Sequence, residues 1–299
     1  EELKNNVSVP NLDAIIGGPP CPAFSKSRFY RKEMTHGTSD SSFSTVIDFF
    51  RVVKTLKPKF FVFENVQTFA AKRQNGALEY VIEQSKNIGY DPNWRILNTL
   101  DYGVPQKRER FILVGHLPEY KFNFPSPTHF SPNNNDMFYK LLPKWRTAGD
   151  AINDLDTKSN GPDLPGHFAG GKHHNLLCQV PPGENYLFFT EKRGYPNPLF
   201  KWRSRYWSFL LKLSPDKPSW TIQARRSNNM GPFHWRNRIL TIPEVKRLQT
   251  FPDNFTFSGT IEQQWKQIGN AVPPMLAECI AREIIKSIQK GIKNGIKAA

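Results

Sequence analysis

Two side chains that can do chemistry stand at the ends of two apolar runs in the first part of the chain. Cys21 follows the run Ala14–Ile16 and the sequence Gly-Gly-Pro-Pro, and Glu64 directly follows the run Lys59–Phe63. An accessible thiolate is a nucleophile, and a carboxyl group with a raised pKa can donate a proton. A single cysteine at the end of a strand is more often a buried structural residue. The inference of a reactive site therefore rests on the pairing of the two side chains.

The segment between Cys21 and Glu64 predicts how these side chains are positioned. It carries apolar residues at helical spacing and ends at Lys57-Pro58, before the second apolar run. Strand, helix and strand in this order form a crossover unit whose two strands are parallel. In a doubly wound sheet, the carboxyl ends of neighbouring strands face the crevice in which ligands bind. We therefore expect the thiol and the carboxylate to converge. The helical residues are Phe43, Val46, Ile47, Phe50, Val53 and Leu56.

The rest of the chain predicts one α/β domain with an insertion. A second helix over Leu78–Ile88 is capped by Gly89, and strands follow at Trp94–Thr99 and Phe111–Val114. From about residue 125 the sequence is rich in Pro, Gly and Asn, which favours loops and short strands. Helical patterns return from Pro243. We therefore predict a catalytic domain built from residues 1–124 and 237–299, with a small loop-rich module at 125–236.

Five short motifs resemble those of the DNA cytosine-5 methyltransferases, and they occur in the order of that family. The resemblance runs from about Leu12 to the C-terminal helix. It implies a Rossmann-like sheet that uses S-adenosylmethionine, an inserted target-recognition domain, and duplex DNA as substrate, in a restriction-modification system. The motifs are Pro20–Cys21, Glu64–Val66, Gln106–Arg110, Arg247–Asp253 and Gln267–Pro274.

The resemblance also implies catalytic roles. Cys21 would add to C6 of a flipped-out cytosine, and Glu64 would donate a proton near N3 if the apolar side chains of Phe61 and Phe63 raise its pKa. Arg110 would contact the base, and Arg108 the backbone and active-site loop. Two residues apart in an extended segment, their side chains share a face. The structural alternatives are a carboxylate that caps a helix and a solvated basic edge strand.

Further residues are predicted to bind the cofactor and DNA. The segment Phe24–Lys32 resembles the family's mobile catalytic loop, although a plain surface loop is the alternative. Arginine and asparagine side chains after residue 224 can read base edges in the major groove. The predicted cofactor contacts are Pro20, Asn270, Ala271 and Val272, and the predicted DNA contacts are Ser25, Ser27, Arg28, Arg225, Arg226 and Arg247.

Between Glu191 and Arg238 the sequence combines basic and aromatic residues. Eleven Lys or Arg residues stand against two acidic ones, which is typical of a surface that contacts a nucleic-acid backbone. For the tryptophans alone, we expect a role in the core of the module. The interleaved aromatic residues are Trp202, Tyr206, Trp207, Trp220 and Trp235.

Composition favours a polyanionic partner and a reducing compartment. The formal net charge is +15, which suits nucleic acid. The three cysteines, Cys21, Cys178 and Cys279, are far apart and lack the spacing of a disulfide framework or a zinc site. No apolar stretch is long enough to span a membrane, and the first residues do not form a signal peptide. The sequence predicts a soluble protein of the bacterial cytoplasm.

One departure from the family concerns the cofactor. The family's Phe-x-Gly-x-Gly turn precedes the Pro-Cys motif, but the twenty residues before Cys21 do not form it. We therefore expect a fragment without its N-terminal strands, a subunit whose partner supplies the cofactor half, or a non-catalytic DNA-binding remnant. A related enzyme that methylates tRNA is a further alternative.

Overall fold

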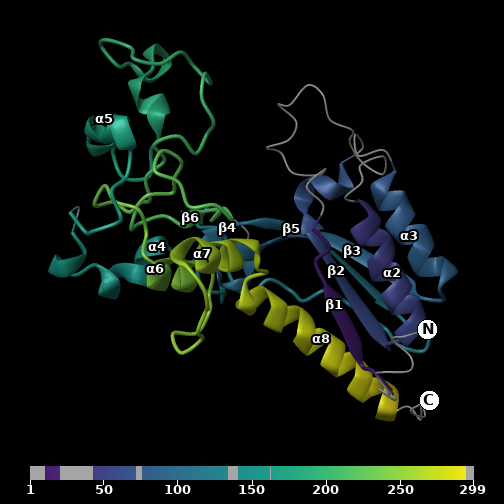
Figure 1. Ribbon diagram of the computed structural model, residues 1–299. Helices are drawn as coiled ribbons and strands as arrows, with labels where there is room; N and C mark the ends of the chain where they lie inside the picture. Colours follow the sequence, from purple (N-terminus) through teal and green to yellow (C-terminus); the bar gives the residue numbers. More distant parts are fainter. Residues whose placement is uncertain (1–10, 21–42, 72–75, 134–140, 162, 294–299) are drawn as a thin grey trace. The chain divides into compact units, whose positions relative to one another are not determined.

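The computed structural model describes residues 11–20, 43–71, 76–133, 141–161 and 163–293. These residues form two compact units (Figure 1). Unit 1 takes in residues 1–98, 109–126 and 279–299, and unit 2 takes in residues 99–108 and 127–278. Among the described residues, each helix is too short or too polar to cross a membrane.

Unit 1 is a four-stranded mixed sheet with helices on both sides. The strand order is β1-β2-β5-β3, with β1 parallel to β2 and β5 antiparallel to both of its neighbours. Figure 1 shows α2 and α3 on one side of the sheet and α8 along the other. The predicted α/β class and the parallel pair are confirmed. The elements are β1 (Ala14–Gly17), α2 (Ser44–Leu56), β2 (Phe60–Val66), η5 (Gln67–Ala70), α3 (Ala77–Asn87), β3 (Asp91–Asn98), β5 (Glu109–His116) and α8 (Pro274–Lys293).

Helix α2 forms and ends where the sequence predicts. Its apolar face packs on β2 through aromatic rings, with Phe49 and Phe50 meeting Phe61 edge to face at 5.9 and 5.8 Å between ring centroids. Such contacts add to the free energy gained by burying the rings. Lys57 takes a left-handed conformation with φ of 46°, which ends the helix before Pro58. The crossover therefore delivers β2 parallel to β1.

Unit 2 contains little regular structure. Its two-stranded sheet pairs β4 with β6 in parallel, and its core joins short helices and 3₁₀ turns. This agrees with the predicted loop-rich texture. The elements are η7 (Thr99–Tyr102), β4 (Gln106–Lys107), α4 (Ala148–Ile152), η9 (Asn153–Leu155), η10 (Lys158–Asn160), η11 (Gly171–His173), α5 (His174–Gln179), η12 (Tyr186–Phe189), η13 (Glu191–Arg193), β6 (Ser219–Trp220), α6 (Ile242–Leu248) and α7 (Ile261–Asn270).

Helices α6 and α7 share the core of unit 2. Val245 and Leu248 of α6 and Trp265 and Ile268 of α7 are buried in the same cluster as Tyr186. The chain from 237 to 278 therefore lies in the same compact unit as the loop-rich segment, and the predicted C-terminal portion 237–299 is divided at residue 278. The physical reason is that the apolar faces of these helices are covered by residues from the inserted segment.

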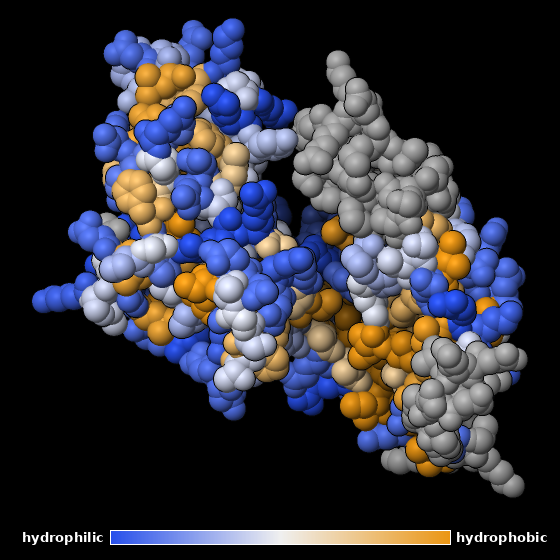
Figure 2. Space-filling model, in the orientation of Figure 1, coloured by the Kyte–Doolittle hydropathy of each residue, from blue (hydrophilic) through white to orange (hydrophobic). Residues whose placement is uncertain are grey.

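The two units present different surfaces. Figure 2 shows hydrophilic residues over most of the visible face of unit 2, whereas hydrophobic residues gather on the visible face of unit 1 around β1. Ile16 in β1 is 71% exposed, and β1 is an edge strand of the sheet.

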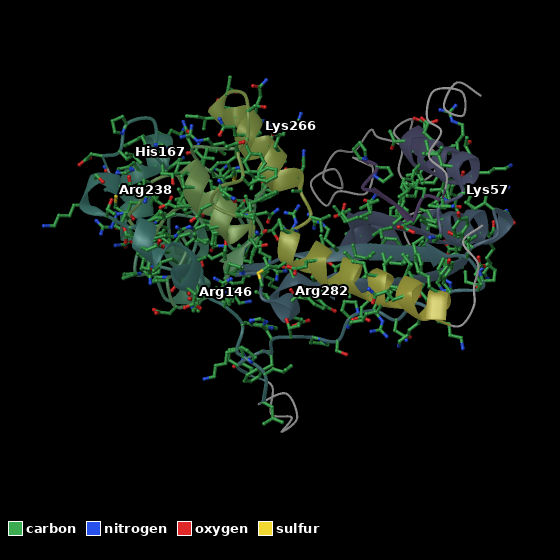
Figure 3. The ribbon with its side chains drawn as sticks, turned by 90° about the horizontal axis from the view of Figure 1, so that it is seen from below. Lys57, Arg146, His167, Arg238, Lys266 and Arg282 are labelled. Carbon is green, nitrogen blue, oxygen red and sulfur yellow. The ribbon has the colours of Figure 1, made fainter. Side chains whose placement is uncertain are left out.

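A fully buried ionic cluster links α6 to the loop before it. Arg238, which lies within unit 2 in Figure 3, binds both oxygens of Glu244 at 2.7 and 2.8 Å. The Nε2 atom of His234 lies 3.5 Å from the same carboxylate, and its Nδ1 accepts the Arg236 amide N–H. Burial lowers the pKa of His234 to about 4, and the charge of Arg238 contributes. His234 is therefore neutral in the folded protein near pH 6.

This pKa predicts a loss of stability in mild acid. Between pH 6.5 and 4 the unfolded chain binds a proton at His234 that the folded chain excludes, so the free energy of unfolding falls as the pH falls. The contribution approaches about 1.4 kcal/mol per pH unit. We expect His234→Asn, whose amide oxygen can still accept the Arg236 N–H, to flatten the dependence of urea unfolding on pH. The control His167→Asn should keep the full slope. Equal slopes in both variants would contradict the assignment.

Candidate functional site

The chain leading to Cys21 is fastened to β2 and α2. Asn65 donates its side-chain amide to the Pro19 carbonyl at 3.3 Å, and the Thr45 hydroxyl donates to the Pro20 carbonyl at 3.0 Å. These bonds join the turn after β1 to the end of β2 and the start of α2. Cys21 itself lies outside the described residues, as do Ser25, Ser27 and Arg28.

Glu64 and Arg110 form an ion pair in the sheet of unit 1. Arg110 Nε lies 2.7 Å from Glu64 Oε1, and the two side chains are only 12% and 14% exposed. The pairing of β2 with β5 places Arg110 opposite Val66, two residues beyond Glu64 on the same face. Burial lowers the pKa of Arg110, and the Glu64 charge opposes that shift. The predicted carboxylate and the predicted base-contacting arginine are thus brought together.

The predicted apolar wall around Glu64 is wrong. Phe61 and Phe63 pack with α2 and α3 in the core of unit 1, whereas Glu64 points to the opposite face of β2, where it meets Arg110. Consecutive side chains of a strand alternate between faces, so neighbours in sequence do not surround the carboxylate. Its partner comes from β5.

Gly18 approaches Glu64 so closely that a side chain at position 18 would displace the carboxylate. A Cβ atom at position 18 would lie 2.7 Å from Glu64 Oε2. The backbone before Cys21 therefore runs directly past the carboxylate. Glycine is needed here for space, since a methyl group would force the carboxylate to move.

Arg108 has a different environment from Arg110. It belongs to unit 2, is 2% exposed, and donates to the carbonyls of Ile222, Gly269 and Ala271 at 3.0, 2.7 and 3.2 Å. A guanidinium can satisfy several carbonyls at once because its donors form a planar fork. In this structure Arg108 therefore holds segments of the protein backbone together. This fits the predicted supporting role of Arg108 better than a direct contact with a DNA phosphate.

Two buried glutamines extend the Arg108 cluster, and sequence reasoning did not select them. Gln106 donates to Gln249 at 2.5 Å and accepts the Ile222 amide N–H at 3.0 Å. Gln249 donates to the carbonyls of Ile268 and Ala271 at 2.9 and 3.0 Å. Both glutamines stand within quoted motifs, at 106–110 and 247–253. Their position inside these motifs is the signal that could have found them.

The predicted cofactor contacts in unit 2 lie at the end of α7. Asn270 is the last residue of this helix and is exposed, while Ala271 and Val272 are half-buried. The carbonyl of Ala271 is held by both Arg108 and Gln249. The backbone of this turn is therefore fixed from within, while the Asn270 side chain faces solvent.

The three predicted DNA-binding arginines that the structure describes differ in their surroundings. Arg225 is exposed. Arg226 is mostly buried, donates to the Gly166 carbonyl, and lies 3.7 Å from Glu262. Arg225 is therefore the most accessible of these cations.

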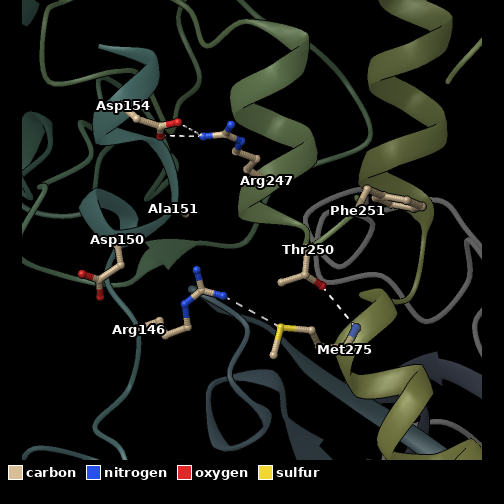
Figure 4. A pocket seen from close by; sticks show the side chains of 8 residues that line it. All are labelled: Arg146, Asp150, Ala151, Asp154, Arg247, Thr250, Phe251 and Met275. Carbon is tan, nitrogen blue, oxygen red and sulfur yellow. Dashed lines mark hydrogen bonds and ion pairs between the residues drawn. The ribbon is translucent and has the colours of Figure 1, made fainter. Parts of the chain in front are cut away.

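Arg247 lines a pocket of about 460 Å³ in unit 2 (Figure 4). Its guanidinium binds Asp154 and Asp253 at distances of 2.5 and 2.7 Å. These hydrogen bonds raise the pKa of Arg247. Arg146 points into the same pocket, where its guanidinium lies 3.9 Å from the sulfur of Met275. Arg247 is thus engaged by two carboxylates, which offset its charge.

The predicted core role of the tryptophans holds for some of them and is wrong for two. Trp235 packs against the core of unit 2, and its indole N–H donates to Asp156 at 2.8 Å. Trp202 and Trp207 are 38% and 49% exposed. They stand in the segment Lys201–Trp207, whose seven residues are all exposed.

Comparison with known proteins places the chain among DNA-modifying enzymes. A family model of the C-5 cytosine-specific DNA methylases matches residues 1–286. The type II methyltransferase M.SacI of Streptomyces achromogenes is 38% identical over 288 residues, which cover 92% of this chain and 72% of that protein. The type II methyltransferase M1.HphI of Haemophilus parahaemolyticus is 30% identical, over 96% of this chain and 72% of its own length.

Solved structures share the fold at low sequence identity. A prophage-encoded E. coli protein, named as a DNA modification methyltransferase, superposes with a TM-score of 0.61 at 22% identity, over 96% of this chain and 82% of that one. The Dnmt2 methyltransferase of S. pombe gives a TM-score of 0.57 at 14% identity, over 93% and 78%. The predicted separate N-terminal subunit gains no support from these relatives.

The Arg108 cluster predicts that lysine cannot replace this arginine. A lysine ammonium can reach at most one of the three carbonyl groups in the same geometry, and the others would lose a buried partner. We expect Arg108→Lys to lower the free energy of unfolding in urea by about 3 kcal/mol. The matched change Arg95→Lys, at an exposed side chain stacked on Phe124 in unit 1, should lower it by less than about 1 kcal/mol. Similar losses of unfolding free energy in the two variants would contradict the inference that Arg108 holds three backbone carbonyls together.

Proposed function

Because the chain belongs to the C-5 cytosine-specific DNA methylases and is a DNA cytosine-5 methyltransferase of the restriction-modification type, we propose that Cys21 is its nucleophile. In this proposal the reaction runs through a covalent bond between the Cys21 sulfur and C6 of a target cytosine. The target base must leave the duplex stack first, since a thiol cannot reach C6 inside the helix.

The covalent bond activates the weakly nucleophilic C5 position. When the Cys21 thiolate adds to C6, the ring becomes an enamine whose C5 carbon can accept a methyl group. S-adenosylmethionine, when bound, would supply that methyl group as an electrophile and leave as S-adenosylhomocysteine. Water acting as a base then takes the proton from C5, the C–H electrons re-form the C5–C6 double bond, and sulfur leaves C6 as the thiolate.

The observation that carries this proposal is the approach of the Gly18 backbone to Glu64. Only Pro19 and Pro20 separate Gly18 from Cys21, and the bonds to their carbonyls hold this turn. Addition of sulfur at C6 makes N3 more basic, so the reaction needs a proton donor on the other side of the ring. Glu64, beside the turn that presents the thiol, meets this requirement once it takes up a proton as the base binds, since Arg110 pairs with its anionic form in the free chain.

Arg110 orients the Glu64 carboxylate and adds positive charge beside it. In the proposed complex, Arg110 contacts the base, and the ion pair of 2.7 Å keeps Glu64 in one rotamer before DNA arrives. Arg108 acts indirectly, by holding the backbone at Ile222 and Ala271. It is therefore a positioning residue.

The cofactor is proposed to contact Pro20 and the turn Asn270–Val272. The exposed amide of Asn270 offers both a donor and an acceptor, and the half-buried Val272 offers an apolar surface. These side chains fit a ligand that carries both an amino acid group and an adenosine.

DNA is proposed to contact the segment with Ser25, Ser27 and Arg28, together with Arg225. Arg225 is exposed and adjacent to residues with hydrogen-bonding side chains, as base readout in the major groove requires. Arg226 and Arg247 remain proposed contacts, but each must first share its charge with the carboxylates that it binds.

Removal of the thiol provides the direct test. We expect Cys21→Ser to reduce methyl transfer from labelled S-adenosylmethionine to duplex DNA by about a thousandfold or more, while the affinity for DNA stays within about threefold. With S-adenosylmethionine present, the unchanged chain should form a covalent adduct with duplex DNA containing 5-fluorocytosine, because fluorine cannot leave C5 as a proton does after methyl transfer, and Cys21→Ser should form none. An adduct with the serine variant would exclude Cys21. If methyl transfer to tRNA were faster than transfer to DNA, tRNA and not DNA would be the substrate.

Gly18→Ala tests the role of the carboxylate without removing it. The new methyl group should displace Glu64, and a displacement of about 1 Å can reduce the rate by about a hundredfold. Single-turnover methylation at saturating DNA measures this step. The control Gly161→Ala should leave the rate unchanged, because a Cβ atom there meets only the Lys158 carbonyl at 3.5 Å. A normal methylation rate in Gly18→Ala would contradict the proposed role of Glu64 in the reaction.

A further inference from the structure

A second pocket of unit 2 lies beside the β4–β6 pair, apart from the residues proposed to do the chemistry. Its volume is about 250 Å³, and its walls include two indole rings and three lysines. The indoles are those of Trp145 and Trp220, and the lysines are Lys107, Lys212 and Lys217. Aromatic surface with several cations suits a flat ring that bears negative charge.

One indole ring and the backbone that carries the other are held before any ligand arrives. Trp145 donates its indole N–H to the Asp101 carboxylate at 3.0 Å. Trp220 stands opposite Lys107 in the β4–β6 register, and the Thr221 hydroxyl donates to the Lys107 carbonyl at 2.6 Å. A ligand that stacks here would therefore not have to order the Trp145 ring or the Trp220 backbone.

The lysines give the pocket a positive charge. The ammonium of Lys107 lies 5.7 Å from the centre of the Trp220 ring. The Lys212 side chain is 2% exposed and donates to the Val180 carbonyl. Burial lowers its pKa to about 8, so the ammonium is still mostly protonated at pH 7 and adds to the positive charge of the pocket. A cationic ligand such as S-adenosylmethionine is therefore disfavoured, and a phosphate-bearing ligand is favoured.

An exposed segment continues this surface outside the pocket. All seven residues from Lys201 to Trp207 are exposed, and they comprise three cations, three aromatic rings and one serine. Trp207 meets the pocket residue Trp220 edge to face at 5.3 Å between ring centroids. Trp220 therefore belongs both to the pocket and to the exposed aromatic surface.

Buried side chains hold the backbone of this segment while its side chains face water. The amide of Asn185 donates to the Trp207 carbonyl at 2.8 Å, and the Tyr186 hydroxyl donates to the Arg205 carbonyl at the same distance. Both anchoring residues are 1% exposed. Exposed tryptophans on a rigid backbone lose little conformational entropy when they bind.

We propose that this pocket binds an unstacked nucleotide of a DNA strand other than the target cytosine. The base lies against the indoles of Trp145 and Trp220, and Lys107 and Lys217 neutralise its phosphates. The strand continues over Lys201–Trp207, where cations contact the backbone and aromatic rings contact bases or sugars. The proposal rests on the proposed function only in taking DNA as the partner.

Short single strands test the pocket separately from catalysis. A thymidine tetranucleotide contains no cytosine, so it cannot be methylated at C5. We expect it to quench the tryptophan fluorescence of the full chain and to bind Trp220→Ala at least tenfold more weakly. Trp220→Phe, which keeps a ring, should recover most of the affinity. The control Trp94→Ala, which removes an exposed indole from unit 1, should bind as the unchanged chain does.

Two further measurements separate the base from the phosphate. A strand of the same length made of abasic sites should bind about as weakly as the tetranucleotide binds Trp220→Ala. Lys107→Gln should reduce the slope of log K against log salt by about one. Because Lys107 is an exposed residue, this variant keeps the test open if Trp220→Ala does not fold.

The outcomes also distinguish this proposal from the proposed function. Covalent capture of 5-fluorocytosine duplex DNA by Trp220→Phe and Trp220→Ala should reach the normal level at saturating DNA, with half-saturation shifted upward only for Trp220→Ala. Equal affinity of the tetranucleotide for the unchanged chain and Trp220→Ala would overturn the pocket assignment. The pocket assignment would also be overturned if the abasic strand bound the unchanged chain as tightly as the tetranucleotide does. Absence of adduct in every variant would instead contradict the proposed function.

Discussion

The guanidinium of Arg108 is withdrawn from water and surrounded by main-chain oxygens, and much of unit 2 is arranged around it. Removing a charge from water is unfavourable unless its donors are satisfied. The partners come from the chain just after β6 and from the end of α7. They lie 114 to 163 positions further along the sequence. Gln106 and Gln249 complete the arrangement by binding each other and the same backbone. Two segments distant in sequence are thereby fixed at one point.

In unit 1 the corresponding constraint is the alternation of side chains along β2. Phe61 and Phe63 supply the core under α2 and α3, and this leaves Glu64 on the other face, where β5 provides Arg110. One face of β2 therefore packs in the core, and the other carries the ion pair that we propose takes part in catalysis. The turn before Cys21 can approach the carboxylate because position 18 has no side chain.

Most of the fold of unit 1 could be predicted because its signals are local. Helical spacing and Lys57-Pro58 identified α2, and the run before Glu64 identified β2. The environment of Glu64 could not be predicted from neighbouring phenylalanines, because alternation places them on the opposite face. Arg247 likewise has a carboxylate partner 93 positions away at Asp154. Such pairs depend on tertiary contacts, which leave no periodic pattern in one sequence. The exposure of Trp202 and Trp207 was missed for the same reason.

The clamp formed by Arg108 acts entirely on carbonyl groups, and this has a consequence for how such proteins diversify. A carbonyl is present whichever side chain a residue carries, so the positions that Arg108 binds can change identity without losing its hydrogen bonds. Surface loops between these anchor points are then free to drift or to be exchanged between relatives. The segments held in this way can therefore change their side chains at the bound positions, because the hydrogen bonds that hold them are accepted by backbone carbonyls.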